Sequence, residues 1–267
     1  MKLQNITSIL ISGAFLFTAL NCASNKLDSG RNLIWSDEFN RKGLPDSTKW
    51  SYEVGGHGFG NEELQFYTNE RLKNARIEKG NLVIEARKER WENNKYTSAR
   101  LLTKGKFAFQ YGTVEVRAKL PKGRGTWPAI WMMSESKENS PFDGEIDIME
   151  HVGYNHGFVH AAIHTKENNQ VIGAEKTNAV FVKNVSERFH VYKADWSPEK
   201  IDFYIDDHKF FSYENNEKNS KTWPFDEPYY LILNLAIGGL WAGKEGVDEI
   251  IFPQKFYIDY VRVYQNQ

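Results

Sequence analysis

The chain has 267 residues, of which 40% are hydrophobic and 14% aromatic, and this composition is typical of a globular protein with a large core. The formal net charge is −1, and no basic stripe or arginine-rich run is present, so nucleic acid is not an expected partner. The single cysteine excludes an internal disulfide bond.

The N-terminal segment has the pattern of an export signal. Met1 and Lys2 are followed by an apolar run from Ile6 to Leu20, which contains Thr and Ser and is too short to span a bilayer comfortably. Cys22 closes this run as in a bacterial lipobox, so residues 1–21 are predicted to be a lipoprotein-type signal peptide and Cys22 the lipidated residue. The alternative is an ordinary secretory signal with an incidental cysteine. We therefore expect an exported bacterial protein that is either secreted or held by its lipid anchor, in the periplasm or at the cell surface.

The rest of the chain is predicted to form one β-rich domain. Residues 22–31 are polar and predict a short tether, whereas 32–267 contain no linker, repeat or compositional break. Helix is expected only in short turns, for instance at 61–64, and the domain is expected to be a monomer. Strand-like runs occur at 81–86, 112–118, 159–164, 189–196, 200–205, 229–236 and 256–264. This pattern predicts an all-β fold, a two-sheet antiparallel β-sandwich or jelly roll.

Three acidic residues lie close together in one of the expected strands, Glu145-Ile146-Asp147-Ile148-Met149-Glu150. Strand alternation places Glu145 and Asp147 on one face and the isoleucines on the other. Glu150 is an odd number of steps away, so a β-bulge near Met149 is needed to bring it to the same face. The sequence therefore predicts a bulged strand that carries three carboxylates on one side of a sheet.

Such a carboxylate cluster is suited to glycoside hydrolysis. Repulsion and partial burial raise at least one pKa, so a protonated acid and an ionised neighbour can coexist near neutral pH. Glycosidases need this separation of carboxyl pKa values. The alternative is the solvated face of an amphipathic strand. Adjacent like charges destabilise a sheet, however, and no cation is interposed here.

Together with these acids, several ordered motifs resemble the bacterial laminarinases of glycoside hydrolase family 16 over nearly the whole mature chain. The motifs are 35–39 (WSDEF), 60–68 (GNEELQFYT), 111–115 (YGTVE), 127–132 (WPAIWM), 145–150 (EIDIME), 234–239 (NLAIGG) and 257–264 (YIDYVRVY). The form E-x-D-x-x-E is similar to that of the laminarinase, agarase and carrageenase branches. The resemblance implies a jelly roll with a concave substrate groove.

The resemblance also implies the catalytic roles. Glu145 would be the nucleophile, Glu150 the general acid/base, and Asp147 would hydrogen-bond to the nucleophile. The chemistry agrees, because a retaining enzyme needs two carboxyl groups about 5–5.5 Å apart, and two glutamates on one bulged strand can meet that separation. No metal or other cofactor is needed for this reaction.

Further positions are candidates for sugar binding. Trp127 and Trp131 precede the acids, and exposed aromatic faces stack on sugar rings, although spacing alone does not distinguish such residues from core tryptophans. Asn61, behind the glycine-rich loop 55–60, is a hydrogen-bonding candidate. The resemblance adds Arg100 and His164, for which a surface arginine and a packed histidine are the alternatives.

A structural calcium ion is the expected metal, again by resemblance. The matching ligands are Glu38, the backbone carbonyl of Gly80, and Asp259, an oxygen-only set of the kind that Ca²⁺ prefers. The alternative is that both acids simply lie at strand edges. No His/Cys cluster indicates zinc.

The expected function is retaining endo-hydrolysis of internal β-1,3-glucosidic bonds in laminarin-like glucans, with mixed-linkage 1,3-1,4-glucan as a further possible substrate. One alternative is a carbohydrate-binding lipoprotein without catalysis, which the intact Glu145 and Glu150 argue against. Another is the same chemistry on a galactan such as agarose or carrageenan. Sulfated polymers would favour more Lys and Arg than this near-neutral chain offers.

Overall fold

A computed structural model describes residues 30–137 and 142–266. The predicted signal peptide, Cys22 and residues 23–29 lie outside the described residues. Arg31 was assigned to the tether, but it begins the first strand and opens the compact unit that runs to the C-terminus.

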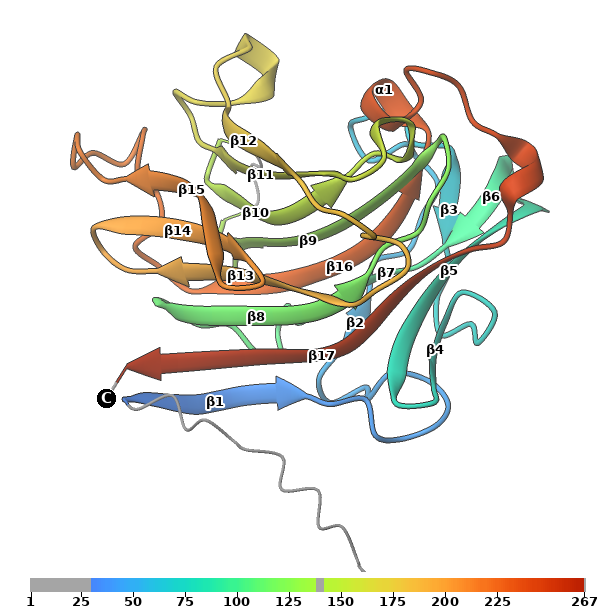
Figure 1. Cartoon of the computed structure of the whole chain (residues 1–267), viewed down its shortest axis with the longest axis horizontal. Helices are drawn as coiled ribbons and strands as arrows, with labels where there is room; N and C mark the ends of the chain where they lie inside the picture. The colour runs from blue at the N-terminus through green and yellow to red at the C-terminus, as the bar shows by residue number, and fades with distance from the viewer. Residues whose placement is uncertain (1–29, 138–141, 267) are drawn as a thin grey trace, which may run out of the picture. The chain divides into compact units, whose positions relative to one another are not determined.

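The strands of this unit form two sheets, one stacked on the other (Figure 1). The larger sheet has the order β15 (His208–Glu214), β14 (Lys200–Ile205), β13 (His190–Trp196), β8 (Gly112–Lys119), β17 (Gln254–Asn266), β5 (Asn81–Trp91), β6 (Asn94–Ser98) and β3 (Gln65–Tyr67), with β1 (Arg31–Asp37) paired to β17 and β4 (Ala75–Glu78) to β5. The second has the order β12 (Lys176–Phe181), β11 (Phe158–His164), β10 (Glu145–His151), β9 (Thr126–Ser134), β16 (Tyr229–Ile237), β7 (Arg100–Leu102) and β2 (Ser51–Tyr52).

The pairing confirms the predicted all-β sandwich. Every pair of strands is antiparallel except β3 with β6, which run parallel. Each of the seven predicted strand runs lies in a strand of the structure, with ends that differ by at most a few residues.

The core lies between the two sheets, and β16 shows how alternation builds it. Leu231, Leu233 and Leu235 point into the main core. Tyr230 and Ile232 point to the other face, where they pack in a smaller cluster with side chains of β9. Every residue of β16 is buried, so this central strand fixes the position of β9 and, through β9, of β10.

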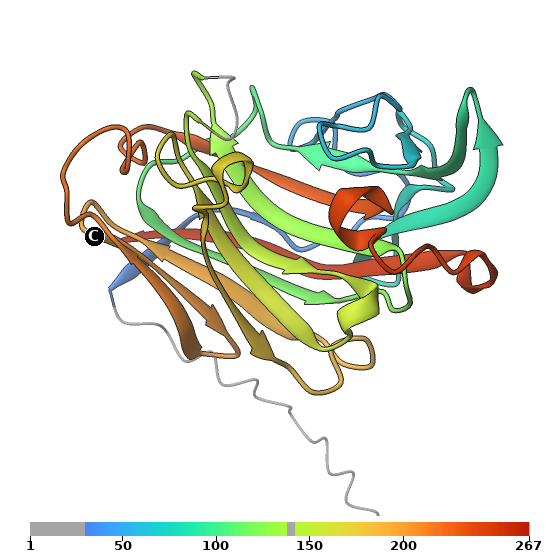
Figure 2. The same ribbon diagram turned by 90° about the horizontal axis from the view of Figure 1, so that it is seen from above.

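Among the residues that the structure describes, helix is confined to short segments: α1 (Gly239–Ala242) and three 3₁₀ turns, η1 (Gly153–Asn155), η2 (Gln170–Ile172) and η3 (Glu249–Ile251). Figure 2 shows α1 from above, over the seven-stranded sheet. Within the described ranges no helix has the length and apolarity to cross a membrane.

The prediction of a helical turn at 61–64 is wrong. This segment is a turn that continues into a bridge between Glu63 and Gly238. Positive φ angles at Gly58, Gly60 and Glu62 interrupt any run of helical dihedrals there.

Candidate active site

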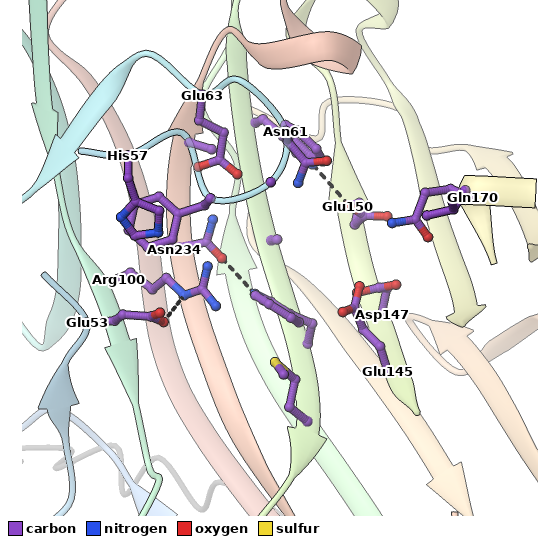
Figure 3. Close-up of a pocket in the computed structure, with 18 of the residues that line it drawn as sticks. Glu53, His57, Asn61, Glu63, Arg100, Glu145, Asp147, Glu150, Gln170 and Asn234 are labelled. Atoms are coloured by element: carbon purple, nitrogen blue, oxygen red, sulfur yellow. Dashed lines mark hydrogen bonds and ion pairs between the residues drawn. The ribbon is translucent and has the colours of Figure 1, made fainter. Parts of the chain in front are cut away.

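The predicted bulge is present in β10. The register of β10 shifts between Asp147 and Glu150 against β11, and between Asp147 and Met149 against β9. Ile148 and Met149 are both buried in the core, so two consecutive side chains point inward. As a result Glu145, Asp147 and Glu150 all line one pocket, and Figure 3 shows them along one side of it.

The opposite wall of this pocket comes from the other end of the same sheet and from loops. Figure 3 places Glu53, His57, Arg100 and Asn234 across from the acids. Trp127 and Trp131, on β9, lie between the two walls as part of the lining. The pocket therefore crosses the strands of the seven-stranded sheet as a groove.

The pKa of Glu150 departs strongly from the usual value of a carboxyl group. Burial, together with the negative charge of Asp147, raises the pKa of Glu150 to about 8. The indole Nε1 of Trp127 donates a hydrogen bond to Glu150 Oε1 at 3.0 Å. A carboxyl group with this pKa is protonated at neutral pH, as a general acid must be, and the direction of the shift agrees with the sequence prediction of a raised carboxyl pKa.

Asp147 has a cationic partner on the neighbouring strand. Nε2 of His164, on β11, lies 3.0 Å from Asp147 Oδ2. Burial lowers the pKa of His164, but its contact with Asp147 outweighs that effect, and the negative charges of Asp147, Glu145 and Glu150 add to it, so that its pKa is raised to about 10. Asp147 and His164 therefore form a largely buried ion pair in the wall of the groove.

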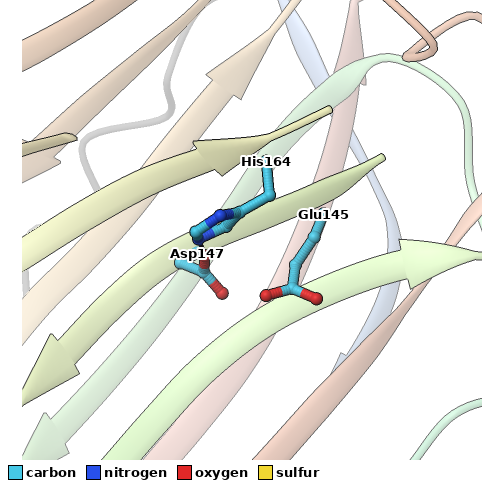
Figure 4. Close-up of side chains that lie close together, drawn as sticks. All are labelled: Glu145, Asp147 and His164. Atoms are coloured by element: carbon cyan, nitrogen blue, oxygen red, sulfur yellow. Dashed lines mark ion pairs between the residues drawn. The ribbon is translucent and has the colours of Figure 1, made fainter. Parts of the chain in front are cut away.

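The same group of side chains has the composition of a metal site. Ligand atoms of Glu145, Asp147 and His164 lie within 4.8 Å of one another (Figure 4). A histidine whose pKa is raised to about 10 is an imidazolium at neutral pH and offers no lone pair to a metal. The cluster is better described as two carboxylates organised by one cation.

A directional series of hydrogen bonds holds Trp131. Its Nε1 donates to Asn234 Oδ1 at 2.7 Å, and Asn234 Nδ2 donates to the hydroxyl of Tyr67 at 3.1 Å. That hydroxyl donates to Glu63 Oε2 at 3.2 Å, and Gln65 Nε2 donates to the same oxygen at 2.6 Å. Since the indole N–H is occupied within the protein, Trp131 presents its ring rather than its polar edge to the groove.

Arg100 contributes to this wall through stacking and charge. Its guanidinium lies 4.7 Å from the ring centre of Trp131 and 5.2 Å from that of Phe59. Its Nε lies 2.7 Å from Glu53 Oε2. Asn61 lines the groove near Glu150, as Figure 3 shows. His57, Phe59 and Gly60 line the groove as well, so the glycine-rich loop 55–60 forms part of its wall.

Most of the site residues predicted from the sequence line the groove, but several other lining residues were not predicted. Trp127, Trp131, Asn61 and Arg100 all line the groove with the acids, whereas His164 contacts Asp147 and lines a second pocket that also contains Glu145 and Glu150. The missed lining residues with polar side chains are Glu53, His57, Glu63, Gln170 and Asn234. Of these, Glu63 and Asn234 stood within recognised motifs and could have been proposed from them.

The three predicted calcium ligands also meet around one hollow. Glu38, Gly80 and Asp259 line it together with Arg117 and Arg262. Both carboxylate oxygens of Glu38 accept hydrogen bonds from Arg262 at 2.8 Å, and Asp259 is paired with Arg117. The donor atoms are oxygens, as Ca²⁺ prefers, but both acids are paired with arginines that binding would have to displace.

Comparison with known proteins assigns the chain to a family. The model of glycosyl hydrolases family 16 matches residues 62–262. The chain belongs to this family. It is 46% identical to a beta-glucanase of Rhodothermus marinus over 99% of this chain and 98% of that protein.

Solved structures of family 16 agree with the fold. The laminarinase from Rhodothermus marinus has a TM-score of 0.87 at 48% identity, covering 89% of this chain and 98% of that chain. A non-specific endo-beta-1,3(4)-glucanase, SCLam, has a TM-score of 0.86 at 46% identity, covering 90% and 92%. The protein is a glycoside hydrolase with the jelly-roll fold of these laminarinases.

Proposed function

We propose that this protein is a retaining endo-hydrolase of internal β-1,3-glucosidic bonds in laminarin-like glucans. The observation that supports this most strongly is Glu150, a carboxyl group with a pKa raised to about 8, on the same face of one strand as Glu145 and Asp147. A protonated acid and nearby carboxylates in an aromatic-lined groove are the parts that double displacement needs.

The proposed reaction has two steps. In the first, a carboxylate oxygen of Glu145 attacks the anomeric carbon while the bond to the glycosidic oxygen breaks, and Glu150 transfers its proton to that oxygen. In the second, Glu150 as a carboxylate removes a proton from water, and the water oxygen displaces Glu145 from the anomeric carbon. The His164 cation, which is paired with Asp147 and lies close to Glu145 as well, offsets the negative charge of both carboxylates.

The charge of the groove supports a neutral polymer. Arg100 is the one Lys or Arg among the described lining residues, and it is already paired with Glu53. Five carboxyl groups line the same groove: Glu53, Glu63, Glu145, Asp147 and Glu150. A sulfated galactan would meet net repulsion here. The names of the similar proteins, a beta-glucanase, a laminarinase and an endo-beta-1,3(4)-glucanase, support a β-1,3-glucan and also include mixed linkage.

The non-catalytic alternative has less support. A binding protein for neutral sugars gains nothing from an acid kept protonated by burial beside two further acids, because that arrangement costs folding free energy. We therefore treat sugar binding as a part of the enzymatic function.

The deciding experiment is product analysis of the purified protein on laminarin, lichenan, agarose and carrageenan, with the Glu145→Gln variant as control. We expect oligosaccharides from laminarin, fewer or none from the galactans, and none from the variant. Proton NMR of the first product should show the β anomer. An initial α anomer would contradict the double-displacement mechanism. Cleavage of a galactan but not of laminarin would contradict the proposed β-1,3-glucan substrate.

We also propose a structural role for calcium and an N-terminal lipid. The meeting of Glu38, Gly80 and Asp259 around one hollow supports the first. The position of Cys22 at the end of the apolar run supports the second, with the enzyme acting outside the cytoplasm as a monomer.

A further inference from the structure

The stretch 55–64, which contains the glycine-rich loop, separates the groove from a hollow on its other side. Glu63 lines both the groove and this hollow. Asn94, in the hairpin of β5 and β6, lines the hollow as well. As far as the structure describes the groove, its lining does not include Asn94. This side chain therefore lies at the back of the groove wall and not in the groove.

The side-chain amide of Asn94 joins two points of the wall that are eight positions apart. Its Nδ2 donates to the carbonyl oxygen of Gly56 at 3.1 Å and to that of Leu64 at 3.3 Å. An amide nitrogen carries two hydrogens, so one side chain can serve both carbonyl groups. The residues between these carbonyl groups that line the groove are His57, Phe59, Gly60, Asn61 and Glu63. Asn94 thus closes the base of the segment that carries them.

The contact between the loop and the hairpin is close because residue 56 has no side chain. A Cβ atom on Gly56 would lie 2.2 Å from Asn94 Oδ1 and 2.8 Å from the ring of Phe66 on β3. Phe66 packs in turn near Trp91 of the same hairpin, with ring centres 6.3 Å apart. The loop backbone therefore rests directly on the hairpin and on β3, and any side chain at residue 56 would push it away.

Individual hydrogen bonds fix the path of the loop. Residues 58–60 and 62 all have positive φ angles, so the stretch follows no regular strand. The carbonyl oxygen of Asn61 accepts a bond from the N–H of Leu240 at 2.7 Å, which fixes the end of the loop nearest Glu150. The part that depends on Asn94 carries His57, which Figure 3 places across the groove from the acids, and Phe59.

We propose that Asn94 is a positioning residue for the glucan, which fixes the loop so that His57 and Phe59 keep their places in the groove wall. The inference rests on the proposed glucan hydrolysis. The ring centre of Phe59 lies 5.2 Å from the guanidinium of Arg100, so movement of the loop would also disturb the packing of that side chain. The catalytic acids lie on β10, in the opposite wall. Loss of the Asn94 contact should therefore weaken substrate binding and leave the chemical step nearly unchanged.

The test is the separate measurement of kcat and KM on laminarihexaose for variants of Asn94. Asn94→Ala should raise KM about three- to tenfold, the effect of one or two lost hydrogen bonds between neutral groups, with kcat within about twofold of wild type. Asn94→Asp keeps the shape of the side chain but turns carboxylate oxygens toward two carbonyl oxygens, none of which can donate. It should therefore raise KM more than Asn94→Ala does, whereas a role in packing alone predicts little change.

Gly56→Ala breaks the same contact from the loop side and serves if the Asn94 variants fold poorly; it too should raise KM with kcat nearly unchanged. Asn93→Ala is the matched control, because Asn93 is the exposed neighbour of Asn94 in the same hairpin, and both constants should stay at the wild-type values. A wild-type KM in Asn94→Asp, or a fall in kcat as large as the rise in KM, would overturn the inference alone. Failure of the wild-type enzyme to cleave laminarihexaose would overturn the proposed function and this inference with it.

Discussion

The hydrogen bond from Trp127 to Glu150 should set the upper pH limit of activity. The bond is 3.0 Å long and stabilises the ionised form of an acid whose pKa is raised to about 8. A hydrogen bond to a charged group contributes about 1.5–3 kcal/mol, and part of it persists when the acid is protonated. At about 1.4 kcal/mol per pKa unit, Trp127→Phe should raise the pKa of Glu150 by about one unit. Because the general acid acts in its protonated form, activity should extend to higher pH.

The assay is the pH dependence of kcat/KM on laminarin, whose alkaline limb reports the general acid of the free enzyme. We expect that limb near pH 8 in the wild-type enzyme and near about pH 9 in Trp127→Phe. The matched control is Trp131→Phe, because the Trp131 indole donates to Asn234 instead. It should weaken binding without moving the limb. A limb that stays in place in Trp127→Phe, or moves to lower pH, would refute the assignment of Glu150 or of this bond.

Three further outcomes are expected. Glu145→Gln and Glu150→Gln should each lower kcat at least about a thousandfold with unchanged circular dichroism, and Asp147→Asn should lower kcat by a smaller factor. Near-wild-type activity of either glutamate variant would contradict the role assigned to that residue. The melting temperature should be higher in millimolar calcium than in the presence of a chelator, because the ion would bind only the folded state. Equal melting temperatures under the two conditions would contradict a structural calcium ion. Cys22→Ser should release the protein from the membrane fraction of its host, and unchanged fractionation would indicate ordinary secretion.

Features that depend only on residue spacing within one segment were predictable from the sequence. Alternation identified the acidic strand, because inward and outward side chains differ in polarity along it, whereas β16 was identified as a nearly continuous apolar run. The odd spacing from Asp147 to Glu150 predicted the bulge, since only an extra residue brings both to one face. These inferences needed no knowledge of neighbouring strands.

What the sequence did not reveal depends on contacts between distant segments. The series from Trp131 to Glu63 joins β9, β16 and β3 with the loop before β3, and no spacing within one segment predicts which donor meets which acceptor. The pairing of His164 with Asp147 was not predicted, because it follows from the register of β10 against β11. Register across strands is not visible in a single sequence without its partners.

The bulge in β10 also bears on how this strand can change length during evolution. With regular alternation, an acid four positions after Glu145 would share its face, whereas here the third acid comes after five. The extra position adds the side chain of Met149 to the core beside Ile148 and leaves all three acids on the groove face. Deletion of Met149 would restore regular alternation, so it would remove one side chain from the core and leave the three acids on one face, and the packing of the sandwich can change at this point while the order of the reactive groups is retained.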